Sequence, residues 1–271
     1  MSLRIQSNIE AFNAHRQLSA TGMALSKSME KLSSGYRINR AADDSAGLAI
    51  SEKLRAEIGG LDQAQRNSQD AVSLVQTAEG AMSEVHSMLQ RVRELAVQYN
   101  NGTLSASDKA SITAEVSQLC AEIDRIGTDT KFNGIAVLTG SSAITFQVGA
   151  DDGQTISVSA VALFGSGSTF KVDSSIFNFG TTVTLASIDA AIQGVSDARS
   201  TFGSVQNRLE HTLNNLATFQ ENLTSSESRI RDVDMASEMV NFTKLQILQQ
   251  AGTSMLAQAN QAPQSVLSLL R

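Results

Sequence analysis

The stretch AVSLVQTAEGAMSEVHSMLQRVRELAVQY, residues 71–99, decides the fold. Its apolar side chains recur at alternating steps of three and four residues, at Val75, Ala78, Met82, Val85, Leu89, Val92, Ala96 and Tyr99. A second apolar row lies beside the first, at Leu74, Ala81, Met88 and Leu95. Such steps place side chains on one helix face, and two adjacent rows make that face wide enough for two neighbouring helices. The stretch therefore predicts a long helix within a bundle.

The same spacing runs through residues 188–233, which predicts a second long helix of roughly 65–70 Å at the standard rise per residue. Between the two, glycines and alternating Thr, Ser and Val residues predict short strands. Residues 146–148 and 156–158 flank an Asp-Asp-Gly-Gln sequence and predict a hairpin, and further strands are expected at 170–172 and 183–185. We expect a mainly α fold: a long antiparallel coiled-coil or helical-bundle rod formed by the N- and C-terminal regions, with a small β-hairpin-rich central segment.

Both ends of the chain are also patterned as amphipathic helices. Near the start, Leu18, Leu25 and Leu32 are spaced by seven residues, before Gly35 breaks the helix and acidic residues at 43 and 44 precede the next one. Near the end, one line holds Leu245, Ala259 and Val266, and its neighbour holds Leu248, Met255 and Leu269. Residues 245–270 carry no charge, but interspersed glutamines argue against a membrane span. These helices are predicted to be covered by a partner, and pairing of the two ends is possible.

Composition restricts the class of function. A single proline and 4% aromatic residues favour long helices, and a net charge of −6 argues against a nucleic-acid partner. The only cysteine, Cys120, lies beside an apolar row and is predicted to be a small, half-buried hydrophobe. The histidines lack metal-ligand spacing, and the acidic pairs at 43–44 and 151–152 are interpreted as helix-start and turn acids. We expect no enzyme activity, no catalytic residues, no metal site and no cofactor.

Five motifs resemble bacterial flagellin. They are LSSGYRINRAADDSAGLAISEKLR (32–55), LQRVRELAVQ (89–98), DTKFNGIAVL (129–138), SRIRDVDMASEM (228–239) and ILQQAGTSMLAQANQAPQSVLSLLR (247–271). The resemblance covers roughly residues 1–150 and 188–271, and it identifies a short form with a minimal central region. It implies residues 1–44 with 231–271 as a terminal coiled-coil domain in the inner filament core. Residues 45–187 with 188–230 would form a rod domain with a small β excursion at about 131–187.

This resemblance also implies the function and the partners. The chain would polymerise with itself into the hollow helical filament of the bacterial flagellum, which serves motility, and its terminal helices would order on assembly. The leucines and other apolar residues of both ends would be the assembly residues. An export chaperone, the filament cap and hook-associated junction proteins would be further partners. The location would be the extracellular filament, reached without a cleaved signal peptide, since no apolar stretch follows the polar first seventeen residues.

A further implication concerns animal hosts. In flagellins that carry the motif, an exposed helix patch is recognised by Toll-like receptor 5. The matching positions are Gln90, Arg91 and Leu95, with Glu115 on the following predicted helix. The alternative is that these are ordinary surface residues that hold adjacent helices together. Two other protein classes also remain open: the hook–filament junction protein of the flagellum, and an unrelated coiled-coil signalling or adhesion protein.

Overall fold

The computed structural model describes residues 8–139, 143–158 and 185–269, with side chains described up to residue 261. This part of the chain is mainly helical, as predicted. Its order is α1 (Ile9–Ser34), α2 (Ser45–Tyr99), α3 (Ala106–Asp129), β1 (Lys131–Phe132), β2 (Ile135–Ala136), β3 (Ile144–Gln147), β4 (Thr155–Val158), α4 (Leu185–Arg231) and α5 (Met235–Leu269). The elements fall into two compact units, described separately below. The terminal unit comprises residues 1–56 and 222–271, and the central unit comprises residues 57–221.

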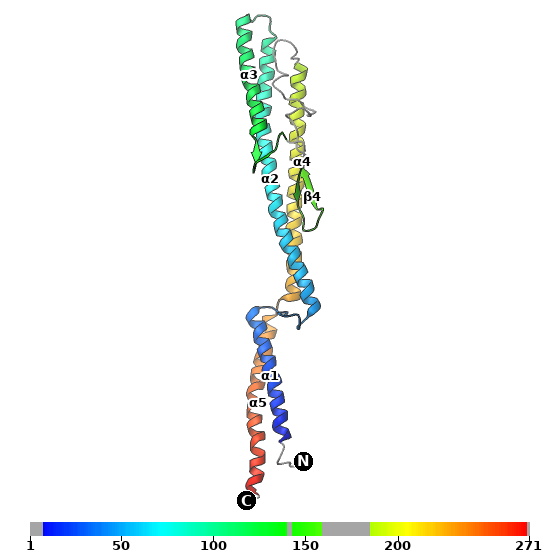
Figure 1. Ribbon diagram of the computed structural model, residues 1–271, viewed down its shortest axis with the longest axis vertical. Coiled ribbons are helices and arrows are strands. Elements are labelled where there is room, and N and C mark those ends of the chain that lie inside the picture. Colours follow the sequence, from blue (N-terminus) through cyan, green and yellow to red (C-terminus); the bar gives the residue numbers. More distant parts are fainter. Residues whose placement is uncertain (1–7, 140–142, 159–184, 270–271) are drawn as a thin grey trace. The chain divides into compact units, whose positions relative to one another are not determined.

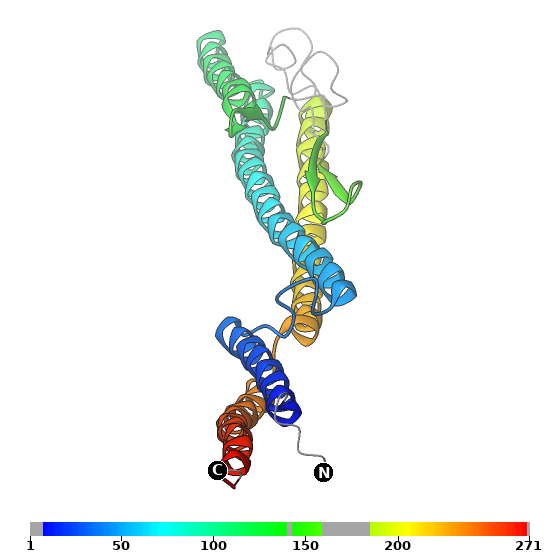
Figure 2. The same cartoon turned by 60° about the horizontal axis from the view of Figure 1, so that its bottom comes forward.

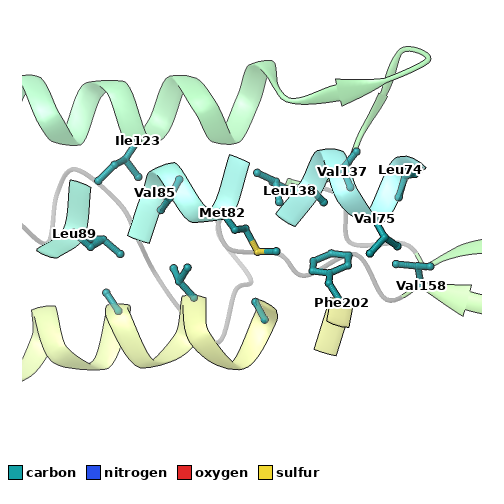
Figure 3. Close-up of a cluster of buried hydrophobic side chains, with 14 of the residues drawn as sticks. Leu74, Val75, Met82, Val85, Leu89, Ile123, Val137, Leu138, Val158 and Phe202 are labelled. Atoms are coloured by element: carbon teal, nitrogen blue, oxygen red, sulfur yellow. The ribbon is translucent and has the colours of Figure 1, made fainter. Parts of the chain in front are cut away.

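The core of the central unit is built around α2, whose two predicted apolar rows both face inward. The seven positions of the first row from Val75 to Ala96 are buried, and Leu74 and Leu95 of the second row are buried as well. Figure 3 shows side chains of α2 lying between α3, which contributes Ile123, and α4, which contributes Phe202. Two adjacent rows on one helix thus pack against two neighbouring helices, as the sequence predicted.

The flanking helices follow local signals in the sequence. A capping box starts α3, since the Ser105 hydroxyl accepts from the Asp108 amide while the Asp108 carboxylate accepts from the Ser105 amide. Cys120 of α3 is buried in the core, somewhat deeper than predicted. The predicted row on α4 is buried as far as Leu216, apart from the partly buried Thr212, but Phe219 is 43% exposed and the helix ends at Arg231.

Two hairpins accompany the helices of the central unit. The predicted one is β3–β4, paired antiparallel with Phe146 opposite Ile156, and Gly153 adopts the positive φ that its turn requires. The hairpin β1–β2 was not predicted, although Asn133 and Gly134 form its turn with positive φ angles. The strand expected at 170–172 lies outside the described residues. The one expected at 183–185 is wrong at its last residue, where α4 begins.

In the terminal unit, α1 and α5 lie side by side and antiparallel (Figures 1 and 2). The Asn8 side chain donates to the carbonyl of Ala259 over 2.7 Å, and 20 residues later Ser28 donates to Glu238 over 2.5 Å. Gly35 ends α1 in the left-handed conformation, with its N–H bonded to the Lys31 carbonyl, as its C-cap position predicted.

Candidate assembly surface

The contact between α1 and α5, here called the α1–α5 seam, follows a seven-residue repeat on both helices. Its partly or fully buried positions are Ala11, Ala14, Leu18, Thr21, Leu25, Ser28 and Leu32 on α1, and Glu238, Phe242, Leu245, Gln249, Gly252, Leu256 and Ala259 on α5. Steps of three and four on both helices are the pattern of a two-stranded coiled coil. Five of the predicted assembly residues therefore pack within one chain: Leu18, Leu25, Leu32, Leu245 and Ala259.

Small and polar residues fix the register of this seam. Gly252 leaves room for Leu18, because a Cβ at Gly252 would lie 3.1 Å from the Leu18 Cδ1. Glu238 accepts the hydrogen bond from Ser28 and lies 3.9 Å from the Lys31 ammonium. Sliding one helix by a turn would separate these polar partners and move the glycine away from the leucine, so one register is favoured.

Around the seam, the same two helices leave ten large apolar side chains exposed, and these residues are here called the terminal face. Its members are Ile9, Phe12, Met23, Met29, Met235, Met239, Val240, Ile247, Leu248 and Met255, which are 47–73% exposed. Leu248 and Met255, the second line predicted from the sequence, belong to this face rather than to the seam. Val266 and Leu269 lie within α5, but their side chains are outside the described residues.

The central unit offers a clear contrast. It is the longer of the two, yet among the described residues only Val97, Ile135 and Phe219 are large apolar side chains that it leaves exposed. Monomeric proteins rarely leave broad apolar patches uncovered, and such patches mark contact surfaces. The terminal face therefore has the exposed apolar character that is typical of a contact surface.

The connections into and out of the terminal helices are paired with each other. Tyr36 and Asp232 form an antiparallel bridge, the Arg37 N–H donates to the Arg231 carbonyl over 2.7 Å, and the Val233 N–H donates to the Gly35 carbonyl over 3.0 Å. The Arg231 guanidinium lies 4.9 Å from the centre of the Tyr36 ring. This arrangement, called the connector pair below, brings two of the sequence motifs together, and no pattern in the sequence predicts it.

Glu52 anchors the connector pair through Arg231, and two further carboxylates order the turn that follows it. Arg231 pairs with Glu52 of α2 over 2.6 Å, and this hydrogen bond lowers the pKa of Glu52. Asp43 accepts from Lys27 over 2.6 Å and from the amides of residues 39 and 40, which lowers its pKa to about 2. Asp44 accepts from the Gly47 amide at the start of α2. The acids at 43 and 44 are thus turn and helix-start acids, as predicted.

The four candidate receptor residues do not share one environment. Gln90, Arg91 and Glu115 are exposed, and Arg91 of α2 donates to Glu115 of α3 over 2.9 Å and 3.1 Å. This bond, and then the one to Glu94, raises the pKa of the Arg91 guanidinium. Leu95, by contrast, is 2% exposed and belongs to the core. The expectation that Leu95 contacts the receptor at the surface is therefore wrong. Leu95 is a packing residue, because the second apolar row of α2 faces the neighbouring helices.

Other chemistry finds little support in the described residues. They contain no group of three or more His, Cys, Asp or Glu residues arranged to hold a metal ion. The Cys120 thiol is buried, and this burial, followed by the charge of Asp124, raises its pKa to about 12, which disfavours the reactive thiolate. None of the described helices has the length and apolar content needed to cross a bilayer.

Comparison with known proteins places these features in context. Residues 5–143 match the family model of the bacterial flagellin N-terminal helical region, and residues 185–270 match that of the C-terminal helical region. Flagellin of Halalkalibacterium halodurans is 51% identical over 98% of this chain and 99% of its own. The flagellar filament 33 kDa core protein of Treponema phagedenis is 46% identical over 98% of this chain and 99% of its own. The crystal structure of Bacillus cereus flagellin is 37% identical over 56% of this chain and 88% of its own, with a TM-score of 0.46.

Proposed function

The chain belongs to the bacterial flagellin family, and from this premise we propose that its terminal face is the surface through which copies of the chain polymerise. As a flagellin it is a structural subunit of an extracellular flagellar filament. The observation that carries the proposal is the contrast between the two units. The central unit covers its apolar rows within one chain, whereas the terminal helices expose ten large apolar side chains.

The energetics of a lone helix pair support this role. Two paired helices have little core, and ordering their residues costs conformational entropy that one seam offsets poorly. Neighbouring copies supply the missing apolar surface, so the terminal helices gain most of their order on assembly. A contact between different surfaces of successive copies, repeated by a rotation that does not close, yields a helical filament and not a ring.

The proposed layers follow from this assignment. Residues 1–44 with 231–271 form the inner layer around the filament channel. Residues 45–187 with 188–230 form the surrounding rod layer, with the β excursion at about 131–187 turned outward. The uncharged glutamines of residues 245–270 then suit the wet side of the inner layer, since they are polar but bind a passing chain only weakly.

A surface that must stay uncovered until assembly also calls for other partners. Before assembly, an export chaperone holds the C-terminal region, where α5 carries six of the ten exposed side chains. At the two ends of the filament, hook-associated junction proteins and the cap take the place of a neighbouring copy. The filament that these copies form serves motility.

Removal of the C-terminal segment tests the proposal. A chain lacking residues 245–271 loses part of the seam and the exposed residues from Ile247 onward, while the central unit is untouched. We expect a helical, soluble protein that forms no filaments by electron microscopy after seeding, under conditions in which the full chain forms long ones. Filaments of normal length from the truncated chain would refute the proposal, and short oligomers from the full chain would favour the junction-protein alternative.

We further propose recognition by Toll-like receptor 5 through Gln90, Arg91 and Glu115. Their exposure on two adjacent helices supports the proposal, and Leu95 acts beneath them by keeping α2 in place. The alternative, a structural ion pair, is tested with R91A/E115A. The matched control is R93A/D189A, which removes another exposed α2 ion pair, of 2.6 Å, directed to α4.

The measurement is signalling in cells that carry the receptor. We expect R91A/E115A to raise the protein concentration that gives half-maximal signalling by about tenfold or more, because the loss of a central pair of interface contacts costs at least that much affinity. The control variant should stay near wild type. Equal signalling by the two variants would reject receptor recognition at this surface. Circular dichroism of both variants shows that the helices are retained.

A further inference from the structure

Methionines are distributed unequally between the two units. The sequence has eight, and five of the seven within the described residues lie on the terminal face with 48–68% of their surface exposed. They are Met23 and Met29 on α1, and Met235, Met239 and Met255 on α5. The central unit has Met82, which is fully buried, and Met88, which is partly buried against the core. The apolar surface proposed for assembly is therefore half methionine, whereas the permanent core uses mainly Leu, Val, Ile and Ala.

A methionine differs from a leucine of similar size in its chemistry. Its thioether sulfur carries a lone pair that accepts an oxygen atom from a peroxide. The O–O bond of hydrogen peroxide breaks, an S–O bond forms, the sulfur loses two electrons, and the peroxide leaves as water. The sulfoxide is polar and has a strong hydrogen-bond acceptor, so it disrupts surfaces that must become dry.

We propose that the five methionines of the terminal face are an oxidation site that switches off polymerisation of the free subunit. The inference rests on the proposed function, because it requires that this face is covered on assembly. In the free chain the sulfurs are open to small oxidants, and in a filament the neighbouring copies cover them. Oxidation therefore blocks subunits that have not yet assembled and spares those that have.

Two of these residues line grooves, and the groove of Met239 shows why a sulfoxide would interfere. Met239 lines a shallow groove on α5 with Val240, Thr243, Lys244 and Ile247, which has mainly apolar walls. Met255 lines a second groove between the start of α1 and the end of α5, whose walls are mixed, since Ala14 and Ala259 lie there with the polar residues Glu10, Asn13, Gln258 and Gln261. An oxygen placed on the Met239 sulfur has to be stripped of water when a neighbouring copy fills its apolar groove. A buried acceptor without a donor is unfavourable enough to weaken association by about tenfold.

The first experiment compares free subunits with preformed filaments, both treated with hydrogen peroxide. Peptide mass spectrometry should find sulfoxide at the five terminal-face methionines of the free subunit and none at Met82. The same residues should be modified at least several times more slowly in filaments. Oxidised subunits should show a critical concentration for seeded polymerisation raised by about tenfold or more. Treatment with methionine sulfoxide reductases A and B should return it to the starting value.

Two variants separate the site from general oxidative damage. In the variant with all five residues changed to Leu, peroxide should no longer raise the critical concentration, measured against the same variant without peroxide. The matched variant M82L/M88L should stay as sensitive as wild type. Normal polymerisation of fully oxidised wild-type subunits, or loss of polymerisation by the five-Leu variant on oxidation, would overturn the inference. A failure of untreated wild-type subunits to polymerise would instead overturn the proposed function on which it rests.

Discussion

Replacing three apolar residues of α5 with glutamine separates assembly from folding. In V240Q/I247Q/L248Q the three changed side chains are 70%, 60% and 47% exposed in the single chain, so their remaining apolar surface is what a neighbouring copy can cover. Glutamine favours helix at least as well as valine or isoleucine, so α5 itself should not weaken. The change therefore acts mainly on the surface available for contact.

The expected size of the effect follows from that remaining exposure. A fully buried Val, Leu or Ile side chain contributes roughly 2 kcal/mol, and 47–70% of each of the three is still to be buried. If neighbours cover all of it, the loss is about 3 kcal/mol for each subunit added. The critical concentration for polymerisation should then rise on the order of a hundredfold.

The assay is seeded polymerisation at a series of subunit concentrations, with sedimentation of the polymer and electron microscopy of the pellet. The control is L209A, which truncates a fully buried side chain in the central unit. It should lower the free energy of unfolding by about 2–5 kcal/mol without changing the critical concentration below the melting temperature. A critical concentration of the triple variant within about threefold of wild type would contradict the 3 kcal/mol worked out above.

Three further predictions address other parts of the chain. Asp43 has a pKa lowered by its hydrogen bond from Lys27, so the stability that it contributes is complete above about pH 4 and is lost as the pH falls toward about 2. Amide hydrogen exchange in the turn before α2 should therefore accelerate as the pH falls over that range. The variant D43N should exchange fast at both ends of the range. Cys120 should react with a maleimide only at the rate of unfolding, with a denaturant dependence to match, and fast labelling of the native chain would show that its burial is wrong. An alanine at Gly59 has open space around it and should stabilise the central unit by up to about 1 kcal/mol. At Gly60 the added Cβ would lie 3.0 Å from the Cβ of Ala150 in the β3–β4 hairpin, and this close contact should cancel or reverse the gain. Denaturant unfolding of the two variants measures the difference.

The long helices were predictable because their signal is local and repeated. The two rows of α2 recur over more than twenty residues, so few errors in single positions affect the result. The β3–β4 hairpin was predictable because its Asp-Gly turn is also a local signal. The β1–β2 hairpin was missed because its strands have only two residues each, although Asn133-Gly134 is among the strongest short-range hairpin signals.

The candidate surfaces were harder to predict, because orientation is a tertiary property. The sequence shows two apolar lines on α5 but not which one α1 covers. The seam takes the line that contains Gly252, where the absence of a Cβ lets Leu18 approach closely, and leaves Leu248 exposed. Leu95 illustrates the converse problem: a motif carries over a residue's identity, whereas its burial depends on the neighbouring helices.

The connector pair was beyond local reasoning altogether. Tyr36 and Asp232 are separated by 195 intervening residues, and no periodicity links them. Their contact depends on backbone hydrogen bonds and on the ring of Tyr36 beneath Arg231, which no sequence spacing encodes.

The connector pair also has a consequence for the order of events in time. Residues 35–37 emerge early from any machine that makes or threads the chain from its N-terminus, but they must wait for residues 231–233 before their backbone groups are paired. Contacts between such distant segments close late, since a long loop has to be ordered first. The two ends therefore form or dissolve as one cooperative element, and a chain halted before residue 231 has no half-formed version of it.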